Sequence, residues 1–254
     1  MKIVSFNLRC VYAGDGINAF PNRAASILLK IESEQPDVIC FQEAMPHNIE
    51  FLEKHLTDYT VIYNQRLKDF SGEGLAFALK NGSVSLYGLE FFWLSDTPYL
   101  PGSRFKNQSE CPRITQSVLI KDMAKSKLFR VYNNHLDHIS DEARILGIKQ
   151  VVRRIKQDRQ KMDLPFFVLG DFNAIPNSDT IKYCRLQKDV PMADLTENTG
   201  GTFHNFGKIE PEKIDYIFAD AKTAQKKYSV KLWDGNTNGV FLSDHYPVEV
   251  DIDF

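Results

Sequence analysis

The sequence predicts an α+β layered fold. Two patterns indicate it: strand-like runs follow one another between residues 59 and 120, and helical spacing is confined to an early and a middle segment. A doubly wound protein would instead alternate strands and helices along its length. With 254 residues and 43% hydrophobic residues, the chain can bury a large core, and no Pro-, Gly- or Ser-rich linker divides it. We therefore expect one domain over residues 1–254.

Short runs rich in β-branched and aromatic residues predict the strands. They cover residues 2–8, 37–41, 59–63, 75–80, 114–120, 128–132, 164–169, 214–218 and 246–252.

Apolar residues at helical spacing predict helices over residues 22–34 and 140–160. Ser140, followed by acidic residues, is a plausible start for the second helix. Residues 95–113 contain three prolines and predict a long loop, either a binding loop or lid or a tolerated surface insertion.

Charge and cysteine usage limit the function classes. The formal net charge of −2 argues against a basic face that clamps long nucleic acid, but a short or local phosphate substrate stays open. The four cysteines are widely spaced, so we expect neither a zinc knuckle nor a disulfide scaffold, and a reducing cytoplasm is the expected location. No stretch has the apolar length of a signal peptide core or a membrane span, so we expect no membrane contact and see no sign of an obligate protein partner.

Several predicted strands end in residues that bind hard cations or move protons. The first ends at Asn7, the second leads into Glu43, and later strands lead into His135 and into Asp171-Phe172-Asn173. Each residue alone is weak evidence, because a polar residue after a strand is usually a solvated turn residue. Ligands collect at strand ends in layered α/β proteins, so together these residues predict one crevice.

The residue types predict the chemistry of that crevice. Oxygen donors such as Glu43, Asp244 and the Asn7 amide suit Mg²⁺ or Mn²⁺, whereas zinc is a poorer match because no two histidines stand at helical ligand spacing. A hard cation with nearby imidazole and carboxylate groups indicates phosphate-ester hydrolysis. A Ser-His-Asp acyl hydrolase is less consistent with the sequence, which has no G-x-S-x-G motif.

Six motifs occur in order over nearly the whole chain: S-F-N-L-R (5–9), Q-E (42–43), N-H-L-D (134–137), G-D-F-N (170–173), I-D-Y-I-F (214–218) and S-D-H-Y-P-V (243–248). In this set the sequence resembles the endonuclease/exonuclease/phosphatase superfamily, which has the pancreatic-deoxyribonuclease-like fold. The resemblance implies a four-layer α-β-β-α sandwich of two packed, largely antiparallel mixed sheets. Residues 93–98, 101–103 and 111–114 are similar to a bacterial branch grouped with nocturnin- and Angel-like enzymes.

The resemblance also implies a metal site and an attacking water. Glu43 would be the principal ligand of Mg²⁺, or of Mn²⁺ as a substitute, with Asn7 and Asp244 assisting directly or through water. Asp171 would position and activate the water, and Asn173 would hold the water and the phosphate.

Two histidines complete the implied catalytic set. His245, oriented by Asp215, would contact the phosphate, and His135 would donate to a non-bridging oxygen. The sequence leaves open whether Asp171 or the Asp215–His245 pair is the base, and we prefer Asp171.

Three further residues are candidates for substrate binding. Arg9 stands where several nucleases of the superfamily carry an additional metal-site acid, so we expect one tightly held metal, with Arg9 paired to Glu43 or to phosphate. Arg113, from the long loop, either reaches a substrate phosphate or caps the loop. His138 is a substrate contact or part of the hydrogen-bonding scaffold.

Three functions remain. The first is hydrolysis of phosphodiesters in nucleic acid, short or single-stranded, or in a nucleotide-like molecule. The second is a phosphatase of a small sugar, inositol or lipid phosphate, which would use the same site. The third, a non-catalytic phosphate-binding protein, is disfavoured because none of the catalytic residue types is replaced at Glu43, Asp171, Asn173 or His245.

Overall fold

Two six-stranded sheets pack face to face in the computed structural model, which describes residues 1–10 and 13–253. The first sheet has the order β11-β14-β1-β2-β4-β3, with β1 (Lys2–Asn7), β2 (Val38–Ala44), β3 (Tyr59–Gln65), β4 (Gly74–Lys80), β11 (Tyr228–Leu232) and β14 (Val248–Ile252). The second has the order β5-β6-β7-β8-β10-β9, with β5 (Val84–Trp93), β6 (Ile114–Asp122), β7 (Lys127–His135), β8 (Phe166–Asp171), β9 (Met192–Asp194) and β10 (Asp215–Asp220).

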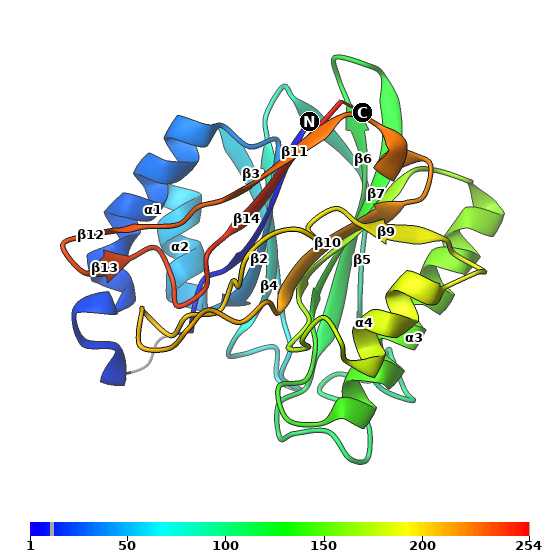
Figure 1. The fold of residues 1–254 in the computed structure, drawn as a ribbon, viewed down its shortest axis with the longest axis horizontal. Coiled ribbons are helices and arrows are strands. Elements are labelled where there is room, and N and C mark those ends of the chain that lie inside the picture. The colour runs from blue at the N-terminus through cyan, green and yellow to red at the C-terminus, as the bar shows by residue number, and fades with distance from the viewer. Residues whose placement is uncertain (11–12, 254) are drawn as a thin grey trace.

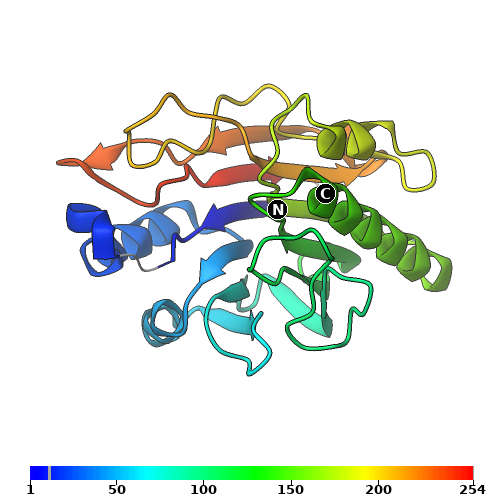
Figure 2. The ribbon, with the colours of Figure 1, turned by 90° about the horizontal axis from the view of Figure 1, so that it is seen from below.

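Helices cover both outer faces of the sheets, which gives the predicted four layers (Figures 1 and 2). At the left of Figure 1, the first sheet is covered by α1 (Phe20–Glu34) and α2 (Pro46–His55). At the right, the second is covered by α3 (Asp141–Lys161) and α4 (Asp179–Leu186). The smaller elements are η1 (Ala13–Asn18), η2 (Thr223–Gln225), and the paired strands β12 (Asn236–Thr237) and β13 (Val240–Phe241).

Each sheet contains one parallel pair among antiparallel neighbours. The parallel pairs are β1 with β2 and β7 with β8, near the middle of their sheets. The α+β sandwich of largely antiparallel mixed sheets is therefore confirmed. Among the described residues, no helix is both long and apolar enough to cross a membrane.

Alternation along the strands divides the core into three apolar layers. In β1, Ile3 packs between the two sheets, whereas Val4 and Phe6 pack toward α1. A third cluster lies between the second sheet and α3, where Ile148, Val151 and Ile155 are buried at helical spacing. These residues belong to the apolar pattern that predicts a helix over residues 140–160, because a helix that covers a sheet shows one apolar face.

The predicted strands and the two predicted helices are all present, with boundaries shifted by a few residues at most sites. Ser140 caps α3 as expected, since its hydroxyl accepts from the amide of Ala143. The sequence analysis missed α2, α4, β5 and the short strands β9 and β11–β13. In β5 a bulge near Tyr87 breaks the alternation, and several of its side chains are exposed.

Polar side chains join the two sheets below their common end. The Nδ2 of Asn133, on β7, donates to the carbonyl oxygens of Phe41 and Ala76 in the first sheet, at 3.0 and 3.1 Å. Its Oδ1 accepts from Nε2 of Gln42 at 2.8 Å. Both side chains are fully buried, so these bonds satisfy groups that water does not reach.

We predict that Asn133→Ala lowers the free energy of unfolding by about 2 kcal/mol, because it leaves several buried polar groups without partners. Urea denaturation measures the change, with Asn107→Ala as the control. Asn107 is exposed and bonds only at the surface, to Glu142, so its substitution should cost less than about 0.5 kcal/mol. Equal, small effects of the two substitutions would show that Asn133 does not join the sheets energetically.

Candidate active site

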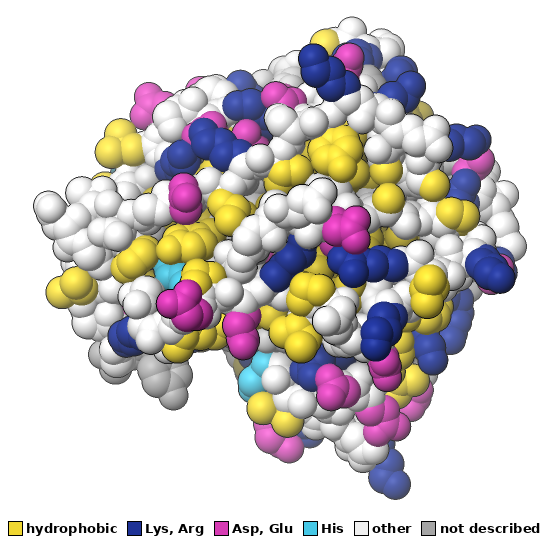
Figure 3. Space-filling view, viewed as in Figure 1, with side chains coloured by type: hydrophobic (Ala, Val, Ile, Leu, Met, Phe, Trp, Pro, Cys, Tyr) yellow, Lys and Arg dark blue, Asp and Glu magenta, His cyan; other side chains and the backbone are white. Residues whose placement is uncertain are grey.

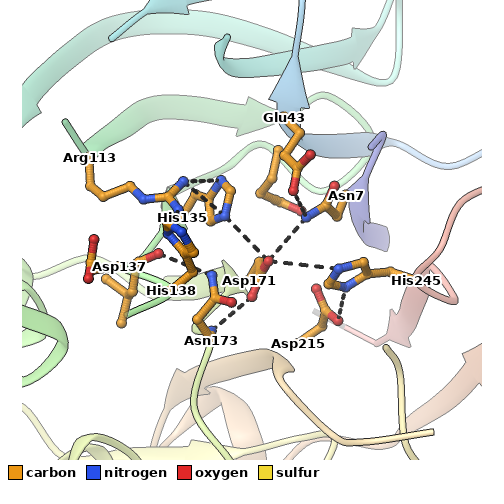
Figure 4. Close-up of polar contacts among 12 residues, drawn as sticks. Asn7, Glu43, Arg113, His135, Asp137, His138, Asp171, Asn173, Asp215 and His245 are labelled. Carbon is orange, nitrogen blue, oxygen red and sulfur yellow. Dashed lines mark hydrogen bonds and ion pairs between the residues drawn. The ribbon is translucent and has the colours of Figure 1, made fainter. Parts of the chain in front are cut away.

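Strand ends from both sheets meet at the end of the sandwich opposite the chain termini (Figures 1 and 4). In the first sheet, β1 ends at Asn7, beside the end of β2, which carries Glu43. In the second sheet, β7 and β8 end at His135 and Asp171, which are in register. The antiparallel strand β10 begins here with Asp215, directly opposite Asp171. The ends of the two parallel strand pairs therefore bring carboxylates, an amide and an imidazole together at one end of the sandwich.

Three residues at or next to these strand ends have unusual backbone conformations that determine where the site side chains lie. A bulge in β2 interrupts its register with β4 next to Glu43, whose φ is 52°. Asn173 has a φ of 47°, and Gly170 has a φ of 130°. A Cβ at Gly170 would lie 2.0 Å from the carbonyl oxygen of Asn134, so only glycine allows β8 to approach β7 this closely. Such conformations concentrate at functional sites.

Asp171 is the centre of the site and is almost fully buried. Its Oδ1 accepts from the backbone amide of Asn173 at 2.8 Å. Its Oδ2 accepts from Nδ2 of Asn7 at 3.1 Å, and it lies 3.4 Å from Nε2 of His135 and 4.0 Å from Nε2 of His245 (Figure 4). The two histidines therefore approach the same carboxylate oxygen from different strands.

The two histidines are in opposite protonation states. Burial acts to lower the pKa of His245, but Asp215, whose Oδ2 is 2.8 Å from Nδ1, and the nearby Asp171 outweigh it and raise that pKa to about 10. For His135, burial and the adjacent Arg113 guanidinium both lower the pKa well below its usual value. His245 is therefore a cation and His135 a neutral imidazole at neutral pH.

The Asp171 carboxyl has an unusual affinity for protons. Burial, followed by the charge of Asp215, raises its pKa to about 7, against the opposing effect of His245. A carboxylate with a pKa in this range is well matched to proton transfer at neutral pH.

Glu43 supplies a second carboxylate from the opposite sheet. Burial acts to raise its pKa, but hydrogen bonds from the backbone amide of Cys10, at 2.7 Å, and from Nδ2 of Asn7, at 3.1 Å, help to hold the pKa below its usual value. One ligand atom from each of Glu43, His135 and Asp171 lies within 4.8 Å of the others. Two carboxylates and an imidazole at this spacing could hold a divalent cation.

Asp244 lies on the segment that leads into β14, and Arg9 contacts it. The Nη1 of Arg9 is 3.5 Å from Oδ2 of Asp244, and its Nη2 is 3.3 Å from Oδ1 of Asp15. The guanidinium therefore forms ion pairs with another candidate metal ligand and with an acid of η1, and contact of Arg9 with a substrate phosphate stays a prediction.

Arg23, which the sequence analysis did not single out, fixes the segments that carry Arg9 and Asp244. It is fully buried on α1 and donates to the carbonyl oxygens of Leu8, at 3.0 Å, and Leu242, at 2.5 Å. In the sequence it is indistinguishable from a surface arginine of an amphipathic helix.

Arg113 lies against the two remaining histidines. Its Nη1 is 2.9 Å from Nδ1 of His135, and its Nη2 is 3.0 Å from Nδ1 of His138, which is largely exposed (Figure 4). Its Nη1 is also 3.4 Å from Oε1 of Glu73, and Glu73 forms an ion pair with Arg66. The sequence analysis missed Arg66 and Glu73; the one available signal was an acid directly before the apolar run of β4.

A four-layer sandwich that gathers these carboxylates and imidazoles at the shared end of its sheets defines a class of phosphoester hydrolases. Residues 4–245 match the sequence profile of the Endonuclease/Exonuclease/phosphatase family, so the chain belongs to that family and is a hydrolase acting on phosphoester bonds. The predicted superfamily is confirmed.

Two relatives match by sequence. The Uncharacterized protein L388 of Acanthamoeba polyphaga mimivirus is 27% identical over 98% of this chain and 99% of its own length. Protein angel of Drosophila melanogaster is 23% identical over 85% of this chain and 66% of its own length. The predicted likeness to Angel-like enzymes is therefore confirmed, while the bacterial origin stays a prediction.

Solved structures resemble the whole chain. An endonuclease/exonuclease/phosphatase from Bacteroides vulgatus has a TM-score of 0.89 at 26% identity, with 99% of this chain and 98% of that one covered. A mannosyl-6-phosphatase from Bacteroides thetaiotaomicron has a TM-score of 0.87 at 25% identity, with both chains fully covered. The human nocturnin catalytic domain, with bound sulfate, shares the fold at a TM-score of 0.76 and 15% identity over 99% and 93% of the two chains.

The charge state of His245 gives a direct test of this geometry. Asp215→Asn removes the nearest negative charge, so we predict that the pKa of His245 falls from about 10 toward or below its usual 6.5. Titration of the imidazole signals by NMR measures it, with His55, on the opposite side of the first sheet, as an internal reference. An unchanged titration of His245 would contradict the pairing.

Proposed function

We propose that the protein is a divalent-metal-dependent hydrolase of phosphate esters, with Mg²⁺ as the cofactor. The observation that carries the proposal is the position of Asp171, between the Glu43 carboxylate of the opposite sheet and the cationic His245. Glu43 would hold the cation as its principal ligand, with Asn7 and Asp244 assisting directly or through water, and the cation would supply positive charge that neutralises phosphoryl oxygens.

The protein's own residues supply proton transfer and orientation. Asp171 accepts a proton from the attacking water, whose oxygen bonds to phosphorus while the bond to the ester oxygen breaks. The leaving oxygen takes up a proton and departs as an alcohol, and Asp171 is returned to its carboxylate form. Asn173 orients this carboxylate through its backbone amide. The cationic His245, held by Asp215, contacts the phosphate, and neutral His135 donates a hydrogen bond to a phosphoryl oxygen.

The protonation states support Asp171 over the Asp215–His245 pair as the base. A histidine with a pKa of about 10 keeps its proton at neutral pH and is a poor acceptor, whereas a carboxyl with a pKa of about 7 exchanges protons readily. This assignment agrees with the preference stated from the sequence.

Two substrate classes use this site. Phosphodiesters of nucleic acid or of a nucleotide-like molecule remain the first hypothesis from the sequence. Small phosphomonoesters gain support from the mannosyl-6-phosphatase, which resembles this chain over its full length. The visible surface also lacks a continuous basic stripe: Lys and Arg are interspersed with Asp and Glu in Figure 3, which is unlike a long nucleic-acid groove.

Metal dependence is tested with Glu43→Gln. We predict that EDTA abolishes hydrolysis by the wild-type protein, that Mg²⁺ or Mn²⁺ restores it, and that Glu43→Gln raises the metal concentration for half-maximal activity at least about tenfold. The matched control is Glu50→Gln, at an exposed position on α2. Full activity in EDTA would contradict the metal requirement.

The base is tested with Asp171→Asn. We predict a fall in kcat of about 10²–10⁴-fold, because the amide cannot accept the proton of water. Steady-state kinetics on p-nitrophenyl phosphate, bis(p-nitrophenyl) phosphate and single-stranded RNA and DNA measure it. Asp163→Asn, at an exposed position after α3, is the control. Intact turnover in Asp171→Asn would refute the mechanism even with the fold unchanged.

A further inference from the structure

A pair of buried arginines borders the carboxylate cluster. Arg66 follows β3, Arg113 precedes β6, and both form ion pairs with the same oxygen, Oε1 of Glu73, which directly precedes β4. The side chains of Arg66 and Arg113 are only 12% and 5% exposed. One carboxylate therefore holds two guanidinium groups in a place that water hardly reaches.

The charges of this cluster do not balance. Within it, two guanidinium cations share the single carboxylate of Glu73. The Nε groups of both arginines are buried, and no described residue accepts a hydrogen bond from either. Buried charged donors without acceptors are costly, so the cluster is complementary to an anion that brings acceptor oxygens.

The cluster adjoins the place of the reacting phosphate in the proposed mechanism. Ligand atoms of Glu73, Glu43 and Cys10 lie within 4.8 Å of one another. On its other side, Arg113 contacts His135, which in turn contacts Asp171. A second cation is disfavoured beside Glu73, because two guanidinium groups already neutralise that carboxylate.

Phosphomonoesters and phosphodiesters differ in the charge and the number of terminal oxygens that they would present to this arginine pair. A phosphomonoester carries close to two negative charges and three terminal oxygens near neutral pH. A phosphodiester carries one charge and two terminal oxygens, with an organic substituent in place of the third. An arginine guanidinium can donate two hydrogen bonds to phosphate oxygens at once. An uncharged substituent in place of the third oxygen offers the guanidinium groups no acceptor and also excludes water from them.

We propose that Arg66 and Arg113, held by Glu73, bind the third oxygen of a terminal phosphate group and make this enzyme select phosphomonoesters over phosphodiesters. The proposal rests on the proposed function and names its substrate class. Arg66 and Glu73 are then specificity-determining residues, and the Glu73 carboxylate spaces the two guanidinium groups.

The test compares kcat/KM for p-nitrophenyl phosphate and bis(p-nitrophenyl) phosphate with Mg²⁺. Loss of a charged hydrogen bond is expected to cost about 10- to 100-fold, so Arg66→Gln should lower the monoester-to-diester ratio of kcat/KM at least about tenfold. Arg66→Lys, which keeps the charge, should retain part of the ratio. Arg153→Gln, at an exposed position on α3, should leave it unchanged. Circular dichroism and thermal melting confirm that each variant is folded.

The outcomes separate this proposal from the proposed function. Wild-type preference for the diester, or an equal loss on both substrates in Arg66→Gln, overturns the selection while metal-dependent hydrolysis stands. If neither substrate is hydrolysed, the anion site is tested by measuring the affinities for inorganic phosphate and dimethyl phosphate by calorimetry in the presence of Mg²⁺. Weaker phosphate binding in Arg66→Gln, by at least about tenfold, supports the anion site even though the hydrolysis proposal has failed on these esters. Unchanged phosphate binding overturns it.

Discussion

The active site depends on the register between two sheets that share no backbone hydrogen bonds with each other. Glu43 comes from one sheet and Asp171 from the other, and Asn7 bonds to both. A slip of one residue along a strand moves a side chain by about 3.3 Å, more than a hydrogen bond tolerates. Apolar packing alone resists such a slip weakly, because it is not directional. The hydrogen bonds that Asn133 and Gln42 form across the sheets are directional and therefore fix the register of one sheet against the other.

The same constraint explains how two histidines come to differ in charge. Each approaches Asp171 through its Nε2, and each has a further charged partner that a strand or loop holds in place. For His245 that partner is an acid at the start of β10, and for His135 it is an arginine that precedes β6. Burial amplifies both effects, because a low effective dielectric strengthens each charge interaction. The strand order thus determines the protonation states as well as the positions.

The sequence predicted the features that depend on local pattern. The strands were identifiable from their short runs of β-branched and aromatic residues. The polar site residues were identifiable because they follow directly after those runs in the sequence. Arg23 and Glu73 were missed because Arg23 donates to the remote carbonyl of Leu242 and Glu73 pairs with the remote Arg113, contacts visible only once the sheets and loops are folded. Arg66 is close to Glu73 in the sequence, but no strand or helix pattern in the loop between them indicates the pair. The ion pair of Arg9 with Asp244 was not foreseen for a similar reason: Asp244 is distant in sequence, and its approach depends on β14 pairing with β1. The missed strand β5 lies at a sheet edge, where a bulge and exposure remove the alternation.

Framework and loops contribute different parts of the site. Asp171, Glu43, Asn7 and His135, which we propose face the phosphate, stand on the central strands of the two sheets. Arg66 and Arg113 stand on the loops that lead into β4 and β6 instead. Loops tolerate insertion and replacement better than central strands do, so they are where one framework acquires different substrates. An arginine pair on two loops that share one carboxylate links those loops to each other. In the proposed mechanism, a change in either loop therefore alters the charge presented to the phosphate without disturbing Glu43 and Asp171 on the central strands.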